Sequence, residues 1–240
     1  MADENAAASA SFSVLLLTAA PQGHAVEAGG AYVKIDGREA LLRSVELFLN
    51  RDNVKQVQIV FNPDEMEEAK RKFGGHLGFS GVKIIPGGPT WADQLAAAAE
   101  KIAPDASHVI VHDAARPAVP YTDIEALMEA AGEGRAVAVL TAPLRASLLE
   151  LDEGRDPVAH HTIAHYVQLL WPQALARGRF AELAKKKQEP HASEMCLVKG
   201  SPLNVRVAGP GDAALVKQMI NMLPKRKLAA PSSPFEEAQW

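Results

Sequence analysis

Short, almost uninterrupted apolar runs recur along the first 140 residues, and segments with helical spacing lie between them. The runs that predict strands are residues 13–18, 57–61, 82–85, 108–112 and 136–140. The segments that predict helices are residues 40–49, 63–73, 90–102 and 121–131. Strands that are apolar on both faces are typical of parallel sheets covered by helices on both sides. We therefore predict an α/β protein, a three-layer α/β/α sandwich with a mostly parallel, Rossmann-like sheet.

The alternation weakens after residue 145. Residues 148–151 and 157–162 predict two strands joined by a turn-rich segment, which together would form a β-hairpin arm projecting from the sheet. Further along, residues 177–187 and 211–222 predict helices, and residues 203–207 predict a last strand. The segment around Cys196 is expected to be helical.

A chain of 240 residues suits one large α/β domain. We expect a disordered leader at residues 1–11, a single domain at residues 12–224 with the arm at about 146–165, and a flexible tail at residues 225–240.

Charge and composition exclude several classes of function. A net charge of −4 gives no basic surface for a nucleic acid. The longest apolar run, residues 14–20, is too short to span a membrane. A single cysteine cannot form an internal disulfide, which is typical of a reducing compartment. We expect a cytoplasmic protein that binds neither nucleic acid nor membrane.

Ligands of such sheets bind beyond the carboxyl ends of the strands. The apolar run at residues 109–112 ends there in the motif HDAARP, residues 112–117. Other motifs follow in a fixed order along the chain: Gly87-Gly88 with Ala92-Asp93, Ala142-Pro143-Leu144-Arg145, Trp171-Pro172-Gln173, Ala192-Ser193-Glu194 and Asn204-Val205-Arg206-Val207.

In these motifs and their order, the chain resembles the 2-C-methyl-D-erythritol 4-phosphate cytidylyltransferases from about residue 13 to residue 222. The resemblance implies a nucleotidyltransferase fold and a role in isoprenoid precursor synthesis. It implies transfer of CMP from CTP to the sugar-alcohol phosphate with release of pyrophosphate. It also implies a Mg²⁺ ion and a homodimer formed through the arm.

The resemblance carries over residue by residue. It implies Asp113 as the magnesium-associated carboxylate, Arg116 and Arg206 as catalytic cations, and Ser147 as a substrate-binding hydroxyl on the arm. The residues that it implies for nucleotide binding are Ala19, Ala20, Gly23, Gly87, Gly88 and Asp93.

Structural alternatives stand beside several of these roles. Asp113 could cap a turn, and Arg116 could hold a loop by a salt bridge instead of binding an anion. Asp93 could be an exposed helix residue, and Trp91 could pack at the edge of the core. The histidines 160, 161 and 165 are expected to be partly exposed side chains, since no recognised ligand spacing completes a metal site.

Several cations of the family pattern are replaced here. The family's first loop carries a Gly, an Arg and a Pro-Lys pair where this chain has Pro21, Ala25 and Gly29-Gly30. A further family Arg is Trp91, the family Ser that follows it is Gln94, and an arm Arg falls at Ile163. Nearby cations that do not match the motif are His24 and Lys34.

Three hypotheses follow. The first is a cytidylyltransferase with altered triphosphate contacts. The second is a catalytically inactive relative that acts as a binding or regulatory dimer. The third is a nucleotidyltransferase for another sugar phosphate.

Overall fold

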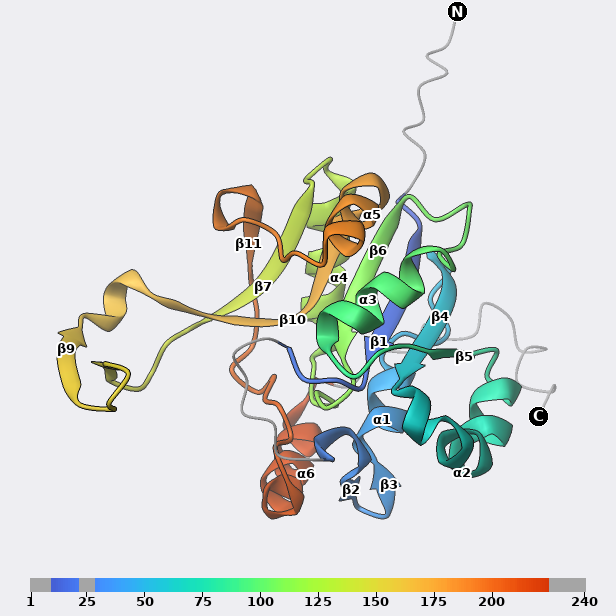
Figure 1. Ribbon diagram of the computed structural model, residues 1–240, viewed down its shortest axis with the longest axis horizontal. Helices are drawn as coiled ribbons and strands as arrows, with labels where there is room; N and C mark the ends of the chain where they lie inside the picture. The colour runs from blue at the N-terminus through green and yellow to red at the C-terminus, as the bar shows by residue number, and fades with distance from the viewer. Residues whose placement is uncertain (1–9, 22–28, 225–240) are drawn as a thin grey trace, which may run out of the picture.

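The computed structural model describes residues 10–21 and 29–224. Its centre is a seven-stranded sheet in the order β11-β7-β10-β6-β1-β4-β5 (Figure 1). The strand β10 runs antiparallel to both of its neighbours, and every other pairing in this sheet is parallel. The prediction of a mostly parallel sheet is confirmed.

The strands predicted in the first 140 residues all form. Their observed bounds are β1 Phe12–Leu17, β4 Val54–Phe61, β5 Lys83–Pro86, β6 His108–Asp113 and β7 Val137–Pro143. The strand β1 is buried at every position, as an internal parallel strand requires.

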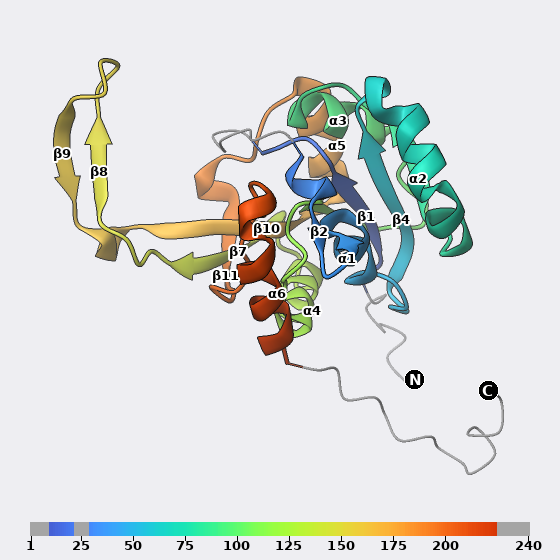
Figure 2. The same ribbon diagram turned by 90° about the horizontal axis from the view of Figure 1, so that it is seen from below.

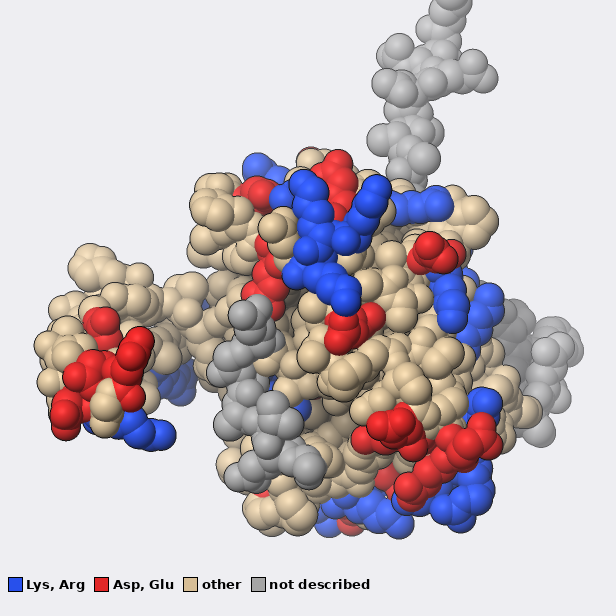
Figure 3. Space-filling model, in the orientation of Figure 1, with Lys and Arg blue, Asp and Glu red and all other residues tan. Residues whose placement is uncertain are grey.

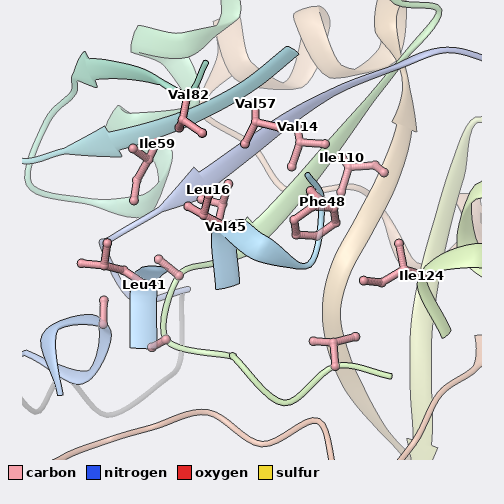
Figure 4. Close-up of a cluster of buried hydrophobic side chains, with 14 of the residues drawn as sticks. Val14, Leu16, Leu41, Val45, Phe48, Val57, Ile59, Val82, Ile110 and Ile124 are labelled. Carbon is pink, nitrogen blue, oxygen red and sulfur yellow. The ribbon is translucent and has the colours of Figure 1, made fainter. Parts of the chain in front are cut away.

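Helices cover both faces of the sheet. Their bounds are α1 Ala40–Glu46, α2 Met66–Phe79, α3 Trp91–Ala99, α4 Tyr121–Gly132, α5 Arg177–Lys186 and α6 Ala213–Met222. Successive residues of a strand point to opposite faces, and β1 shows both layers. Val14 and Leu16 pack with residues of α1, α2 and α4 (Figure 4), whereas Leu15 and Leu17 pack with residues of α3 and α5.

A smaller apolar cluster ties α6 to the edge of the domain. The two-stranded ribbon of β2 Lys34–Ile35 and β3 Arg38–Glu39 lies beside α6, and Ile35 shares a cluster with Val207 and Val216.

The predicted arm is present as a separate two-stranded antiparallel sheet. It pairs β8 Leu148–Leu151 with β9 Pro157–His161 and projects from the body of the molecule (Figures 1 and 2). The long strand β10, Val167–Ala176, starts at the base of the arm and enters the sheet between β6 and β7.

Three sequence predictions are wrong. Residues 203–207 form no strand: Leu203, Val205 and Val207 alternate with polar residues in the sequence, but the structure buries Asn204 and Val207, three positions apart in an irregular segment. Cys196 lies not in a helix but in the edge strand β11, Met195–Lys199. The helix predicted at residues 40–49 ends at Glu46, and the backbone N–H of Leu47 bonds to Val45 O in a tightened last turn.

Parts of the predicted domain organisation lie outside the described residues. The tail at residues 225–240 and residues 1–9 of the leader lie there. Of the leader, Ala10 and Ser11 are described, and the Ser11 N–H donates to Ser107 Oγ at 3.0 Å. Among the described residues, no helix has the length and apolar character that a bilayer crossing demands.

Candidate active site

The carboxyl ends of two adjacent strands define the site. The strands β1 and β6 are parallel neighbours, and Leu17 pairs with Asp113 at their last positions. The loop that starts at Thr18 and the HDAARP loop therefore leave the sheet side by side. Ala114 N–H donates to Leu17 O at 2.9 Å and joins the two loops.

A cavity of about 550 Å³ lies at this edge. Its walls come from residues 18–20, residues 29–32, the start of α3, and the side chains of Lys187 and Arg206. Its position agrees with the rule that ligands bind beyond the carboxyl ends of parallel strands. The volume suits a small-molecule ligand of nucleotide size.

Asp113 is fully buried and accepts bonds through both carboxylate oxygens. Oδ1 accepts the Ala115 N–H at 3.0 Å, and Oδ2 accepts Arg206 Nε at 3.0 Å. Arg116 Nε lies 3.4 Å from the same Oδ2. One carboxylate thus sits between two guanidinium groups, so the cluster carries one excess positive charge.

Arg116 lies beneath the cavity and is not among the residues that line it. Only 2% of its side chain is exposed, and Nη1 donates to Asn204 O at 2.9 Å. Its guanidinium lies 5.2 Å from the ring centroid of Trp171. Burial lowers the pKa of Arg116 and Asp113 opposes that shift, so the side chain stays charged. These contacts fit a side chain that holds the loop and the 204–207 segment together.

The neighbouring histidine adds no charge. Burial lowers the pKa of His112 to about 3, so the ring is neutral at physiological pH. Its Nε2 lies 3.1 Å from Arg116 O, as a donor to that carbonyl.

Arg206 is the catalytic candidate that reaches the cavity. Its side chain is 10% exposed, it lines the cavity, and its Nε is fixed by Asp113. An arginine anchored at Nε can still present its terminal nitrogens to an anion.

The described residues do not fit a magnesium ion held by the protein. Both oxygens of Asp113 already accept N–H donors, and the two arginines beside it would repel a metal ion. Within residues 10–21 and 29–224, no three His, Cys, Asp or Glu side chains are grouped as metal ligands. This includes the arm histidines, where His161 instead bonds Glu150 Oε2 at 2.7 Å.

Gln94 binds a backbone N–H group that was predicted to contact the triphosphate. Ala19 N–H donates to Gln94 Oε1 at 3.1 Å, and Gln94 Nε2 lies 3.3 Å from Thr18 Oγ1. The side chain of Gln94 is buried. An amide expected at the triphosphate therefore has a partner inside the protein. Ala20 also lines the cavity, and Gly23 lies outside the described residues.

Gly87 and Gly88 allow close packing between β5 and α3. A Cβ atom on Gly87 would overlap Val60, and one on Gly88 would overlap the Asp93 side chain. Neither glycine lines the cavity, and both instead let the turn before α3 pass close to β4 and to the first turn of that helix.

The segment at Gly29-Gly30 has a backbone that a Pro-Lys pair cannot adopt. Gly29 has φ of 103°, whereas proline is fixed near −65°. A Cβ atom on Gly30 would overlap Val207 O. The replacement of the family's Pro-Lys pair is thus built into the packing of the loop. Lys34, a nearby cation, points elsewhere and lies 3.8 Å from Glu39.

Asp93 lies in the first turn of α3 and bonds to two neighbours. Thr90 Oγ1 donates to Asp93 Oδ2 at 2.6 Å, and Lys187 Nζ donates to Oδ1 at 2.6 Å. The bond from Lys187 is the largest cause of the lowered pKa of Asp93. Thr90 caps this helix, since its Oγ1 accepts the Asp93 N–H at 3.2 Å.

Of two further residues at the cavity wall, the sequence predicted the placement of one and gave no sign of the other. Trp91 is 7% exposed and meets Trp171 edge-on at 5.9 Å, which confirms its placement at the edge of the core. Lys187 was missed, since it follows two other lysines and no motif marks it.

Ser147 is exposed at the start of the arm, and Ile163 lies on a short 3-10 turn beyond β9. Neither lines the cavity within this chain. The structure therefore brings Arg206, Asp113, Ala19 and Ala20 together, and keeps the arm apart.

Comparison with known proteins agrees with the motifs. The family model described as 2-C-methyl-D-erythritol 4-phosphate cytidylyltransferase (IspD) matches residues 13–221. The protein of that name from Escherichia coli (strain K12 / DH10B) is 30% identical over 200 residues, covering 78% of this chain and 83% of the relative.

Solved structures share the fold. The 4-diphosphocytidyl-2C-methyl-D-erythritol synthase of Anaerococcus prevotii superposes with a TM-score of 0.71 at 12% identity, over 89% of this chain and 97% of the other. The 2-C-methyl-D-erythritol 4-phosphate cytidylyltransferase of Thermus thermophilus gives a TM-score of 0.66 at 23% identity, over 87% and 98%. With the family model covering most of its length, the chain belongs to the 2-C-methyl-D-erythritol 4-phosphate cytidylyltransferase family.

Proposed function

We propose that this chain binds CTP in the 550 Å³ cavity and transfers CMP to 2-C-methyl-D-erythritol 4-phosphate, releasing pyrophosphate. The observation that carries the proposal is Arg206, which Asp113 fixes at the edge of a cavity beyond the carboxyl ends of β1 and β6. A cytoplasmic location is part of the same proposal.

In this reaction the phosphate of the sugar alcohol attacks the α-phosphorus of CTP, and the bond to the pyrophosphate oxygen breaks. Two anions approach each other, so positioned cations supply most of the rate enhancement. Arg206 supports this role because its position is fixed before the ligand arrives. Asp113 holds Arg206 in place, and Arg116 beside the same carboxylate gives the cluster its excess positive charge.

The magnesium ion that the family implies would have to be held mainly by the phosphates of CTP, because Asp113 is already bonded to nitrogen donors. Such an ion usually keeps several waters and binds substrate phosphates with one or two carboxylates.

We also propose a homodimer formed through the arm, which would place Ser147 at the site of the partner subunit. Six large apolar side chains of this region are exposed: Leu149, Leu151, Val158, Ile163, Tyr166 and Val167. A two-stranded hairpin is marginally stable alone in water, so burial of this surface would stabilise it.

A second function is favoured by two observations. Ala19 N–H already bonds Gln94, and the Gly29-Gly30 backbone excludes the Pro-Lys pair. Fewer phosphate contacts favour a family member that binds a nucleotide without transferring it. A nucleotidyltransferase for another sugar phosphate would instead keep transfer and change only the acceptor.

Pyrophosphate release measured with CTP and 2-C-methyl-D-erythritol 4-phosphate tests the proposal. Release that needs both substrates, and that falls at least about a hundredfold in Arg206→Gln, is the expected result. CTP binding without release favours the binding protein. Pyrophosphate release that occurs only with a different acceptor favours a nucleotidyltransferase for another sugar phosphate.

A further inference from the structure

A lysine that no family motif contains lies at the proposed nucleotide cavity. Among the described residues that line the cavity, the cations are Arg206 and Lys187. Arg206 is mostly buried and fixed by Asp113, whereas the Lys187 side chain is 57% exposed. Lys187 is therefore the cation that can move toward a ligand.

The backbone at Lys187 is unusual for a lysine. It follows the last residue of α5 with φ of 52° and ψ of 43°, in the left-handed region. The backbone is held there by two bonds, Lys187 N–H to Ala184 O at 3.2 Å and Gln188 N–H to Leu183 O at 3.0 Å. Glycine is the residue that this helix end prefers. Because a lysine is less stable than a glycine in this backbone conformation, its presence here suggests that the side chain has a function.

The ion pair that Lys187 forms with Asp93 is a weak one. Its Nζ donates to Asp93 Oδ1 at 2.6 Å and links the end of α5 to the first turn of α3, which lies beside it (Figure 1). Both side chains of this pair are solvent-accessible, and exposed pairs contribute little to stability. A phosphate with more negative charge can therefore compete with Asp93 for the ammonium group.

Other charges around the cavity make a further cation necessary. Glu65 and Glu189 also line it, and both oppose an anionic ligand. Glu65 Oε2 accepts a hydrogen bond from the Tyr32 hydroxyl. The excess charge of the Asp113 cluster and a Mg²⁺ ion on the phosphates together do not offset two carboxylates and a triphosphate.

We propose that Lys187 leaves Asp93 and binds a phosphate oxygen of the nucleotide, replacing one of the cations that the family carries on the loop after β1. The inference rests on the proposed function for its ligand, a nucleoside triphosphate. Asp93 then acts as a positioning residue, which holds the ammonium group at the cavity before the ligand binds.

Calorimetric titration of the full chain with CTP, and separately with inorganic pyrophosphate, tests the proposal. Lys187→Gln is compared with Lys186→Gln, which removes the same charge from the same helix end but not from the cavity. We expect about tenfold weaker CTP binding in Lys187→Gln, the loss of one charge-assisted hydrogen bond, with no change in Lys186→Gln and recovery in Lys187→Arg.

Lys187→Gly separates ligand binding from folding. Glycine suits φ of 52°, so this variant is expected to melt at a higher temperature than the parent while it binds CTP as weakly as Lys187→Gln. Equal CTP affinity in the parent, Lys187→Gln and Lys187→Gly would overturn the inference and leave the proposed function standing. Pyrophosphate binding that depends on Lys187, without CTP binding, would support Lys187 as a phosphate-binding residue but reject a nucleotide as its ligand, and with it the proposed function. No binding of either probe to the parent chain rejects both.

Discussion

Asp113 Oδ2 and Arg206 Nε lie 3.0 Å apart although 93 positions of the chain separate them. The bond joins the end of the central strand β6 to a segment that belongs to no strand. Val207 N–H strengthens the junction by donating to Ala115 O at 2.8 Å. The geometry of the proposed active site therefore depends on a buried ion cluster.

Replacing Asp113 by Asn is expected to lower the free energy of unfolding by about 3–5 kcal/mol, because Arg116 would remain buried without a carboxylate. Urea unfolding measures this value. Asp64→Asn, at an exposed position, is the control and should change it by less than about 0.5 kcal/mol. Equal effects of the two variants would show that the cluster does not stabilise the fold.

Gly30→Ala is expected to destabilise the protein by about 1–3 kcal/mol, since its Cβ atom would overlap Val207 O. Gly75→Ala, inside α2 with open space around it, should instead stabilise by about 0.5–1 kcal/mol. Thermal unfolding of the two variants compares the same substitution in opposite settings. A melting temperature for Gly30→Ala at or above that of the parent would contradict the described packing of this loop.

Gln94→Ser removes the bond to Ala19 N–H and is expected to cost about 1–3 kcal/mol of stability. The same change should strengthen CTP binding, because the Ala19 amide becomes available to a phosphate oxygen. Gln218→Ser, at an exposed position in α6, controls for the substitution itself. If Gln94→Ser lowers stability and CTP affinity together, the amide does not take part in binding.

Leu149→Glu is expected to convert a dimer into a monomer, because it places a charge on the exposed apolar side of the arm. Light scattering coupled to size exclusion measures the mass. Leu215→Glu, on an α6 side chain that is 58% exposed, should leave the mass unchanged. A parent chain that is monomeric at all accessible concentrations would rule out the proposed dimer.

The sequence predicted the sheet well because the central strands contain uninterrupted apolar runs, such as residues 14–17 and 109–111. The strand β1 and the run before HDAARP carry this signal without any knowledge of their partners. The sequence did not predict the strands β10 and β11. The first residues of β10 are exposed and Pro172 interrupts its apolar pattern, while β11 is a short edge strand with partly exposed residues.

The candidate site was predicted in part, for a physical reason. The motifs name residue types, and they pointed to Asp113, Arg116 and Arg206, which the structure brings together in one ion cluster. They do not show which donors a carboxylate already accepts, so the bonds from Ala115 and Arg206 appear only in the fold. Lys187 reaches the cavity through the packing of α5 against α3, and no local pattern encodes that contact.

Charges of both signs lie on the described part of the face shown in Figure 3, where Lys and Arg side chains are found beside Asp and Glu side chains. Positive charge at the proposed site comes from individual side chains, chiefly Arg206 and Lys187.

Calorimetric titration of the purified chain with CTP and Mg²⁺ tests whether the cavity binds a nucleotide. We expect micromolar binding, which Arg206→Gln weakens strongly because that side chain lines the cavity. Absence of heat at millimolar CTP, in a chain shown to be folded by its melting curve, would contradict the assignment of the cavity as a nucleotide site.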